Sequence, residues 1–167
     1  MPVLSLSIGS NVNASVNVRR AVAALRAHFG ELEMSTVYES EAVGFDGDNF
    51  LNLVVITATN ESLGAISTYL KDLEDQMGRD RSKPRFSGRL IDVDILTYGD
   101  LDGKLDGVEL PRDEVTRNAY VLRPLAELLP DQQHGPSGKT YAQLWEEYDK
   151  SRQSLWPVAM DWAQGLE

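Results

Sequence analysis

The spacing of hydrophobic and polar positions predicts strands and helices in alternation along the first part of the chain. Residues 3–8 alternate an apolar face with a more polar one, which indicates a strand, and Gly9-Ser10-Asn11 is typical of the turn that ends it. Alternation over residues 32–38 predicts a second strand. The apolar runs within residues 50–58 and 90–98 predict a third and a fourth strand.

Helical spacing separates these strands in two places. Asn13 or Ser15 is suited to cap a first helix, which Gly30 ends. Asn60 or Ser62 is suited to cap a second helix. Its apolar side chains are spaced by three and four residues, as on one helical face: Leu63, Ile66, Leu70, Leu73 and Met77. This stripe predicts a helix that packs on a core.

The order strand-helix-strand-strand-helix-strand predicts an α+β fold of the ferredoxin-like βαββαβ type. In this fold an antiparallel sheet carries both helices on one face. The loop of residues 39–49 and the loop before the fourth strand are then expected to meet over the open face. C-terminal additions are expected: a short strand within 104–110, a short helix over 123–129 with Pro124 in its first turn, and a last helix over 141–148.

Length and composition limit the classes of protein to consider. The 167 residues predict a single domain, 1–167, and the pattern assigns nothing to the tail after about residue 150. The chain has no cysteine, which excludes disulfides, and its two histidines, His28 and His134, are far apart and expected at the surface, which argues against zinc. No signal peptide and no membrane span are recognisable, so a soluble cytoplasmic protein is expected. The net charge of −10 argues against general nucleic-acid binding.

One basic segment stands out against this acidic background, and two carboxylates follow it. The cationic residues are Arg79, Arg81, Lys83, Arg85 and Arg89. Asp92 and Asp94 lie two positions apart in the fourth strand, so they are expected on one face with Cα atoms about 6.6 Å apart. Paired carboxylates suit Mg²⁺, and guanidinium groups suit phosphate. The pattern favours a Mg²⁺–nucleotide site over its plain alternative, solvated acids beside a solvated basic loop.

Several short motifs, taken together, resemble those of one enzyme family. Ile8-Gly9-Ser10-Asn11 is similar to its G-S-N motif, and residues 38–44, Tyr-Glu-Ser-Glu-Ala-Val-Gly, resemble its Y-x-T/S-x-P-x-G loop. Phe50-Leu51-Asn52 matches (Y/F)-L-N. Gly78-Arg79-x-Arg81 followed by Arg89-x-x-Asp92-x-Asp94-Ile95 is the most specific match. Over roughly residues 1–145 the chain thus resembles the 6-hydroxymethyl-7,8-dihydropterin pyrophosphokinase family of folate biosynthesis.

The resemblance implies an ATP-dependent diphosphokinase. Members transfer the β,γ-pyrophosphate of ATP to the hydroxymethyl oxygen of the pterin and release AMP. By resemblance, Asp92 and Asp94 would hold two Mg²⁺ ions, and Arg79 and Arg89 would act on the phosphates as catalytic residues. The resemblance further implies an ATP site made by Glu74, Arg81, Arg85, Ile95 and Arg112. It implies a pterin site made by Ser40, Val43, Phe50, Asn52, Phe86 and Tyr120.

The chain departs from the family pattern at a few positions. Ser87-Gly88 stands where the family usually has Gly-Pro, and Ala42 replaces a proline in the loop after Ser40. Arg112 replaces the usual histidine after Leu110-Pro111. Asn118 stands in place of an arginine, with Arg117 one position earlier.

These departures keep two alternatives open. The first is a diverged paralogue with the same nucleotide site but another pterin-like substrate. The second is a non-catalytic ferredoxin-like module that binds RNA or a protein; a binding module has no need of Asp92 and Asp94 together. The expected partners are small molecules, ATP and a pterin, with neither nucleic acid nor membrane, and the chain is expected to be a monomer.

Overall fold

A computed structural model describes residues 1–42, 47–78 and 90–162. The main sheet of the described chain is antiparallel and runs in the order β10-β3-β4-β1-β5, with β2 also paired to β4. Its strands are β1 (Val3–Ser10), β2 (Glu33–Met34), β3 (Val37–Ser40), β4 (Phe50–Ala58), β5 (Asp92–Tyr98) and β10 (Leu155–Val158).

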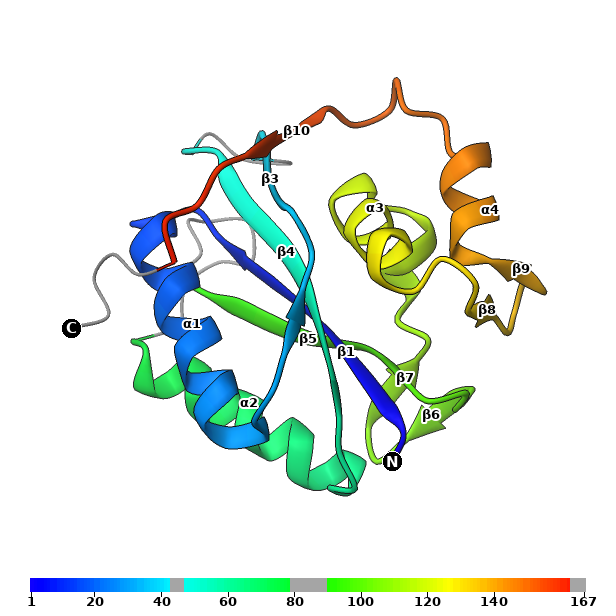
Figure 1. The fold of residues 1–167 in the computed structure, drawn as a ribbon, viewed down its shortest axis with the longest axis horizontal. Coiled ribbons are helices and arrows are strands. Elements are labelled where there is room, and N and C mark those ends of the chain that lie inside the picture. Colours follow the sequence, from blue (N-terminus) through cyan, green and yellow to red (C-terminus); the bar gives the residue numbers. More distant parts are fainter. Residues whose placement is uncertain (43–46, 79–89, 163–167) are drawn as a thin grey trace.

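The helices α1 (Ala14–Phe29) and α2 (Leu63–Gln76) lie together on one face of this sheet (Figure 1). The main core lies between them and the sheet, because alternate strand residues such as Leu6, Leu53 and Val93 point toward this side. The strand order and the placement of the helices confirm the predicted ferredoxin-like βαββαβ fold. None of the helices in the described ranges is long and apolar enough to cross a membrane.

The opposite face of the sheet is partly covered by C-terminal elements (Figure 1). A second cluster of buried residues joins Val54 and Leu96 of the sheet to α3 and α4. The chain reaches these helices through the hairpin of β6 and β7 and a short 3₁₀ helix, η1. The elements are β6 (Gly103–Leu105), β7 (Val108–Leu110), η1 (Asp113–Thr116), α3 (Ala119–Leu128), β8 (Gln133–His134), β9 (Lys139–Thr140) and α4 (Tyr141–Glu147).

The predicted second strand is divided into β2 and β3. Ser35, between them, donates its backbone N–H to the carbonyl of Val54 at 2.9 Å, and its hydroxyl accepts the Val54 N–H at 3.0 Å. A side chain thus replaces one backbone acceptor, and the ladder is interrupted. The predicted fourth strand begins at Asp92 rather than residue 90.

Helix α3 also differs from its prediction. It begins at Ala119 instead of residue 123, so Pro124 lies inside the helix and not in its first turn. The strand expected over 104–110 is a hairpin that turns at Asp106 and Gly107. His134 was expected at the surface but is buried, with 8% of its surface exposed. The cap predicted for α2 is confirmed, since Ser62 accepts the N–H of Ala65.

The tail to which the pattern assigned nothing contributes an edge strand to the sheet. Strand β10 pairs antiparallel with β3, with Leu155 opposite Ser40 and Val158 opposite Val37. Figure 1 shows β10 beside β3 at the edge remote from β5. The residues just before β10 are thereby brought to the end of β3, where the loop after Ser40 begins.

Candidate active site

A cavity of about 1070 Å³ opens on the sheet face opposite α1 and α2, and it also reaches side chains of α2 beside the outer strand β5. Its floor is made by neighbouring strands in register. Gly9 of β1 lies opposite Asn52 of β4 on one side and opposite Asp92 of β5 on the other. Ser7 lies opposite Asp94 in the same way. An amide, an open glycine position and two carboxylates therefore follow one another across the sheet at the bottom of one cavity.

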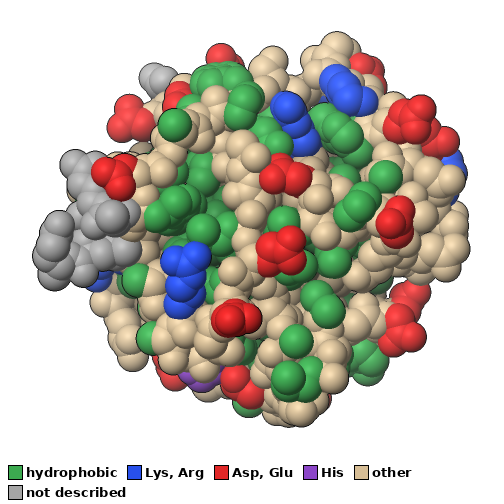
Figure 2. Space-filling model, viewed as in Figure 1, with side chains coloured by type: hydrophobic (Ala, Val, Ile, Leu, Met, Phe, Trp, Pro, Cys, Tyr) green, Lys and Arg blue, Asp and Glu red, His purple; other side chains and the backbone are tan. Residues whose placement is uncertain are grey.

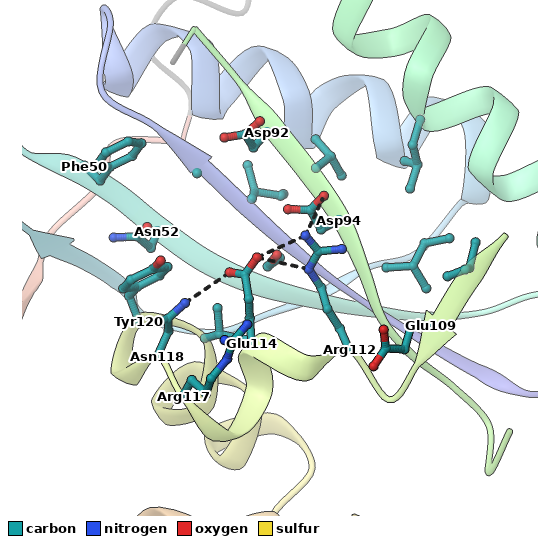
Figure 3. Close-up of a pocket in the computed structure, with 18 of the residues that line it drawn as sticks. Phe50, Asn52, Asp92, Asp94, Glu109, Arg112, Glu114, Arg117, Asn118 and Tyr120 are labelled. Carbon is teal, nitrogen blue, oxygen red and sulfur yellow. Dashed lines mark hydrogen bonds and ion pairs between the residues drawn. The ribbon is translucent and has the colours of Figure 1, made fainter. Parts of the chain in front are cut away.

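Asp92 and Asp94 both line this cavity, and they point to the same side of β5 (Figure 3). The residues between and after them, Val93 and Ile95, are buried in the main core. The strand alternation predicted from the sequence is thus confirmed in the geometry. The core residues fix the strand, and the strand presents both carboxylates to the cavity.

Glu74 of α2 fixes this part of β5 from the edge of the sheet. Its side chain is only 5% exposed, and one carboxylate oxygen accepts the backbone N–H of Val93 at 2.8 Å. Within the described chain the one strand that pairs with β5 is β1, so the Val93 N–H lies on the open edge and takes a side chain as its acceptor. Glu74 lines the cavity as well, so it contributes charge to the site and anchors the strand that carries the aspartates.

Negative charge is concentrated around Asp94. Its side chain keeps 36% exposure toward the cavity, yet burial raises its pKa to about 6. Arg112 acts against this rise, while Asp92, Glu114 and Glu74 add to it. Arg112 Nη2 lies 3.8 Å from Asp94 Oδ1. A cation in this cavity would therefore meet converging carboxylates with one arginine already beside them.

Arg112 is held by Glu114. Its Nη2 donates to Glu114 Oε1 at 3.0 Å and its Nε to the same oxygen at 3.3 Å. Burial alone would lower the pKa of Arg112, but Asp94 and Glu114 outweigh it and raise that pKa. Figure 3 shows the guanidinium between the two carboxylates. The arginine is thus fixed in its charged form at the wall of the cavity.

Asn118 binds the second oxygen of the same carboxylate. Its Nδ2 donates to Glu114 Oε2 at 3.2 Å (Figure 3). Arg112 and Asn118, two departures from the family pattern that line the cavity, are therefore joined through Glu114. Arg117, which the sequence offered as a substitute charge, also lines the cavity but pairs with Asp113 at 2.8 Å and is 62% exposed.

The other end of the cavity carries aromatic side chains and an amide. Figure 3 shows Phe50, Asn52 and Tyr120 gathered there, away from Glu109. Asn52 is buried, and its Nδ2 donates to the carbonyl of Tyr38 at 3.2 Å and to Ser40 Oγ at 2.9 Å. These two bonds fix the amide, so its oxygen faces the floor as an acceptor. Burial, followed by Glu114, raises the pKa of Tyr120 to about 12, which keeps its hydroxyl protonated.

The described residues of the predicted site converge on this cavity. Those that line it are Ser40, Phe50, Asn52, Glu74, Asp92, Asp94, Ile95, Arg112 and Tyr120. Ile95 also belongs to the main core, so its side chain packs toward the helices. The remaining predicted residues lie outside the described residues: Val43, Arg79, Arg81, Arg85, Phe86 and Arg89.

Sequence reasoning missed several lining residues. Lys71 and Lys104 add cations from α2 and β6, and Glu114 follows two residues after the departure at Arg112. Arg152 and Gln153 enter from the tail. They also line a smaller cavity of about 220 Å³ beside Ser40 and Tyr120. Of these residues, Glu114 is the one that the sequence could have indicated, because it lies two positions after Arg112. The tail residues reach the cavity only through the pairing of β10 with β3.

The carboxylate pair fits a hard cation. Among the described residues no group of three or more His, Cys, Asp or Glu is placed to hold a metal ion, so Asp92 and Asp94 would act as a pair. Mg²⁺ binds typically through one or two carboxylates, with waters and substrate phosphates as its other ligands. A pair of aspartates in a cavity large enough for a nucleotide is therefore a suitable donor set for Mg²⁺.

The face drawn in Figure 2 carries side chains of both charges. Figure 2 shows Asp and Glu side chains spread over the drawn face, with the Lys and Arg side chains among the coloured residues apart from one another. A tract that binds a phosphate backbone requires basic side chains close together. Among the coloured residues of this face, no such tract is present.

The known proteins that this chain resembles are named for the same pyrophosphokinase or for folate synthesis. A 2-amino-4-hydroxy-6-hydroxymethyldihydropteridine pyrophosphokinase of Synechocystis sp. is 31% identical over 157 residues, covering 92% of this chain and 79% of the relative. The enzyme of that name from Aquifex aeolicus is 30% identical over 136 residues, covering 80% and 84%. A folate synthesis bifunctional protein of Chlamydia caviae is 30% identical over 146 residues, which cover 83% of this chain. This chain spans only 33% of the length of that protein.

Solved structures show the same fold. The Plasmodium falciparum HPPK-DHPS with pteroate matches 88% of this chain with a TM-score of 0.67 at 15% identity, and this chain spans 42% of it. An HPPK-DHPS in complex with substrates matches 90% with a TM-score of 0.69, and this chain spans 46% of it. Residues 5–130 match the family described as 7,8-dihydro-6-hydroxymethylpterin-pyrophosphokinase (HPPK). The fold, the aspartate pair and these matches together establish that the chain belongs to the HPPK family.

Proposed function

We propose that the chain transfers a pyrophosphoryl group from ATP to the hydroxymethyl group of 6-hydroxymethyl-7,8-dihydropterin, a step of folate biosynthesis. The hydroxymethyl oxygen attacks the β-phosphorus and forms a new O–P bond. The bond from that phosphorus to the oxygen bridging to the α-phosphorus breaks, AMP leaves, and the hydroxyl proton is released. One observation carries the proposal: Asp92 and the fixed amide of Asn52 lie on either side of Gly9, and Asp94 lines the same cavity two positions along β5.

The aromatic end suits the pterin. A flat heteroaromatic ring stacks favourably on the aromatic groups Phe50 and Tyr120. The oxygen of Asn52 is oriented to accept an N–H of the ring, because its NH₂ group is already committed to Tyr38 and Ser40. The hydroxymethyl group would then extend toward the aspartates, since the floor continues from Asn52 through Gly9 to Asp92.

The charged end suits the triphosphate. Asp92 and Asp94 are the residues that would hold the two Mg²⁺ ions expected from the family, and these ions would neutralise phosphate charge and orient the reacting groups. Arg112 is fixed beside them by Glu114 and is available to a phosphate oxygen. Lys71 and Lys104 add positive charge along the same cavity. The roles of Arg79, Arg81, Arg85 and Arg89 on phosphate, and of Val43 and Phe86 on the pterin, stay predictions.

A coupled assay for AMP release tests the proposal directly. The protein is incubated with ATP, Mg²⁺ and 6-hydroxymethyl-7,8-dihydropterin, with the pterin omitted in the control. AMP formed only with pterin present is the expected result. Binding of Mg²⁺–ATP without AMP release would contradict the assigned substrate and favour the diverged paralogue, to be examined with other pterins. A monomeric state and a cytoplasmic location also stay predictions.

A further inference from the structure

We infer that Arg152 and Gln153 of the tail belong to the active site and that Gln153 is a positioning residue, which holds Arg112 beside Asp94 through Asn118 and Glu114. The inference deepens the proposed function and rests on it for the nature of the ligand, the triphosphate of ATP. Gln153 lies 35 positions from Asn118 in sequence, so only the pairing of the tail with the sheet brings them together.

Gln153 first supplies a cap to helix α3. Its Oε1 accepts the backbone N–H of Ala119, the first residue of the helix, at 2.7 Å. Asn118 occupies the N-cap position, but its side chain makes no capping bond. An asparagine at that position normally caps its own helix. Gln153 instead satisfies the N–H of Ala119, which the helix itself leaves without a partner, and the side chain of Asn118 makes a different contact.

Asn118 holds Glu114 with its side chain. Gln153 Nε2 donates to Asn118 Oδ1 at 2.9 Å, which leaves the Nδ2 of Asn118 to donate to Glu114 Oε2 at 3.2 Å. Glu114 Oε1 accepts from Arg112, whose Nη2 faces Asp94 at 3.8 Å. Each amide has a defined orientation, because each end of it has a different partner. The series of contacts therefore runs without a gap from the tail to the carboxylate pair.

The tail is anchored on both sides of Gln153. Before it, the hydroxyl of Tyr148 donates to the carbonyl of Arg117 at 2.8 Å. After it, Leu155 begins the pairing of β10 with β3. A residue held between fixed points loses little further entropy when it forms its bonds. Arg112, a long side chain with many rotamers, gains a fixed direction through Glu114 and so is ready to meet a phosphate oxygen.

The variant Gln153→Glu separates the capping contact from the positioning contact. A carboxylate still accepts the Ala119 N–H, and its negative charge is favourable at a helix N-terminus. It has no N–H for Asn118 Oδ1, so Asn118 turns its amide and withdraws its donor from Glu114. Helix α3 and the position of Tyr120 should be retained, and only the support of Arg112 should be lost.

Gln133→Glu is the matched control, because Gln133 is an exposed glutamine of β8 that does not line either described cavity.

The measurements are the KM for ATP, the KM for the pterin, the melting temperature, and the Kd of a non-hydrolysable ATP analogue with Mg²⁺. We expect Gln153→Glu to raise the KM for ATP and the analogue Kd by about tenfold, as for the loss of a charge-assisted hydrogen bond. The KM for the pterin and the melting temperature should stay close to those of the wild type. Gln133→Glu should leave all four quantities unchanged.

The same substitution in an Arg112→Ala background decides whether Gln153 acts through Arg112. We expect less than about a twofold further change in the analogue Kd, because the effects of two substitutions in one hydrogen-bond network do not add. Asn118→Ala should match Gln153→Glu and add nothing to it. An equal effect of Gln153→Glu in both backgrounds, or a wild-type Kd in Gln153→Glu, would overturn the inference.

The two proposals fail in different ways. A wild-type protein that binds the analogue but forms no AMP would contradict the proposed substrate while the Kd series still tests Gln153. A wild-type protein that does not bind the analogue with Mg²⁺ would overturn both.

Discussion

The carboxylate of Glu74 accepts the backbone N–H of Val93 at 2.8 Å, at the residue that separates the two aspartates of the site. The contact joins helix α2 to the outer edge of β5 and is buried. A buried N–H that loses its acceptor costs about 1–3 kcal/mol. The positions of Asp92 and Asp94 therefore depend on a side chain from another element.

Replacing Glu74 should weaken both the fold and the reaction. Glu74→Ala leaves the Val93 N–H without this acceptor and should lower the free energy of unfolding by about 2 kcal/mol. Glu74→Gln keeps an oxygen that can accept the hydrogen bond, so its free energy of unfolding should fall clearly less. Urea unfolding of both variants gives the comparison, and the AMP assay gives the rate. Equal stability of Glu74→Ala and the wild type would show that the contact does not hold β5.

Removing the charge of Asp94 should abolish transfer without harming the fold. Asp94→Ala leaves a cavity wall intact but removes a ligand expected for Mg²⁺, so AMP release should disappear while the circular dichroism spectrum stays that of the wild type. Near-normal turnover in this variant would exclude the two-metal arrangement.

Asp94→Asn should be more stable than the wild type at neutral pH when EDTA is present. The raised pKa of about 6 means that the folded state binds its proton more tightly than the unfolded state, whose pKa is near 3.8. The wild type therefore loses stability as the pH rises from 3.8 through about 6, and the amide does not. Urea unfolding at several pH values checks this, and a variant less stable than the wild type at neutral pH would contradict it.

Gly9→Ala should affect pterin binding more than stability. Gly9 lies in a strand, and an added Cβ would be 3.5 Å from Asn52 Oδ1 and 4.0 Å from Phe50 Cδ1, at ordinary contact distances. The fold should accept the methyl group, but it would cover the floor between Asn52 and Asp92. We expect the KM for the pterin to rise about tenfold and the KM for ATP to change little. A parallel rise in both would place the pterin elsewhere.

Protonation of His134 should destabilise the fold in mild acid. Burial lowers the pKa of His134 below 6.5 despite the opposing charge of Asp102, and the Ser137 N–H donates to its Nδ1 at 3.2 Å. The unfolded chain thus binds the proton first, and stability falls as the pH drops below 6.5 toward the folded pKa. Unfolding free energies at about pH 7.5 and about pH 5.5 should differ less in His134→Gln than in the wild type, with His28→Gln as the control.

The sequence predicts what depends on local periodicity. The stripe from Leu63 to Met77 predicts α2, and the alternation of Asp92 and Asp94 predicts the charged floor, because each pattern is a direct consequence of backbone geometry. Ser35 interrupts the second strand through a hydrogen bond to a residue on another strand, which no local pattern indicates. Pro124 similarly indicates a helix start near residue 123. The helix begins at Ala119 instead, and its buried face packs against Val54 of the sheet on both sides of Pro124.

The tail was not predictable for the same reason. Residues 155–158 contain a proline and gain their strand structure from pairing with β3. Gln153 has no distinctive neighbours in the sequence, and its contacts with Asn118 and Ala119 arise only once β10 is in place. The acidic pair could therefore be located from the sequence, but the support of Arg112 required the tertiary structure.

Both outer strands of the main sheet, within the described chain, have an obstacle to further pairing. On β5 the N–H of Val93 is taken by Glu74, and on β10 Pro157 has no N–H to offer. An exposed strand edge otherwise serves as a template for another chain, and proteins avoid this by such interruptions. The glutamate that fixes the aspartates thus also protects the sheet against edge-to-edge aggregation at one end, and the proline does so at the other.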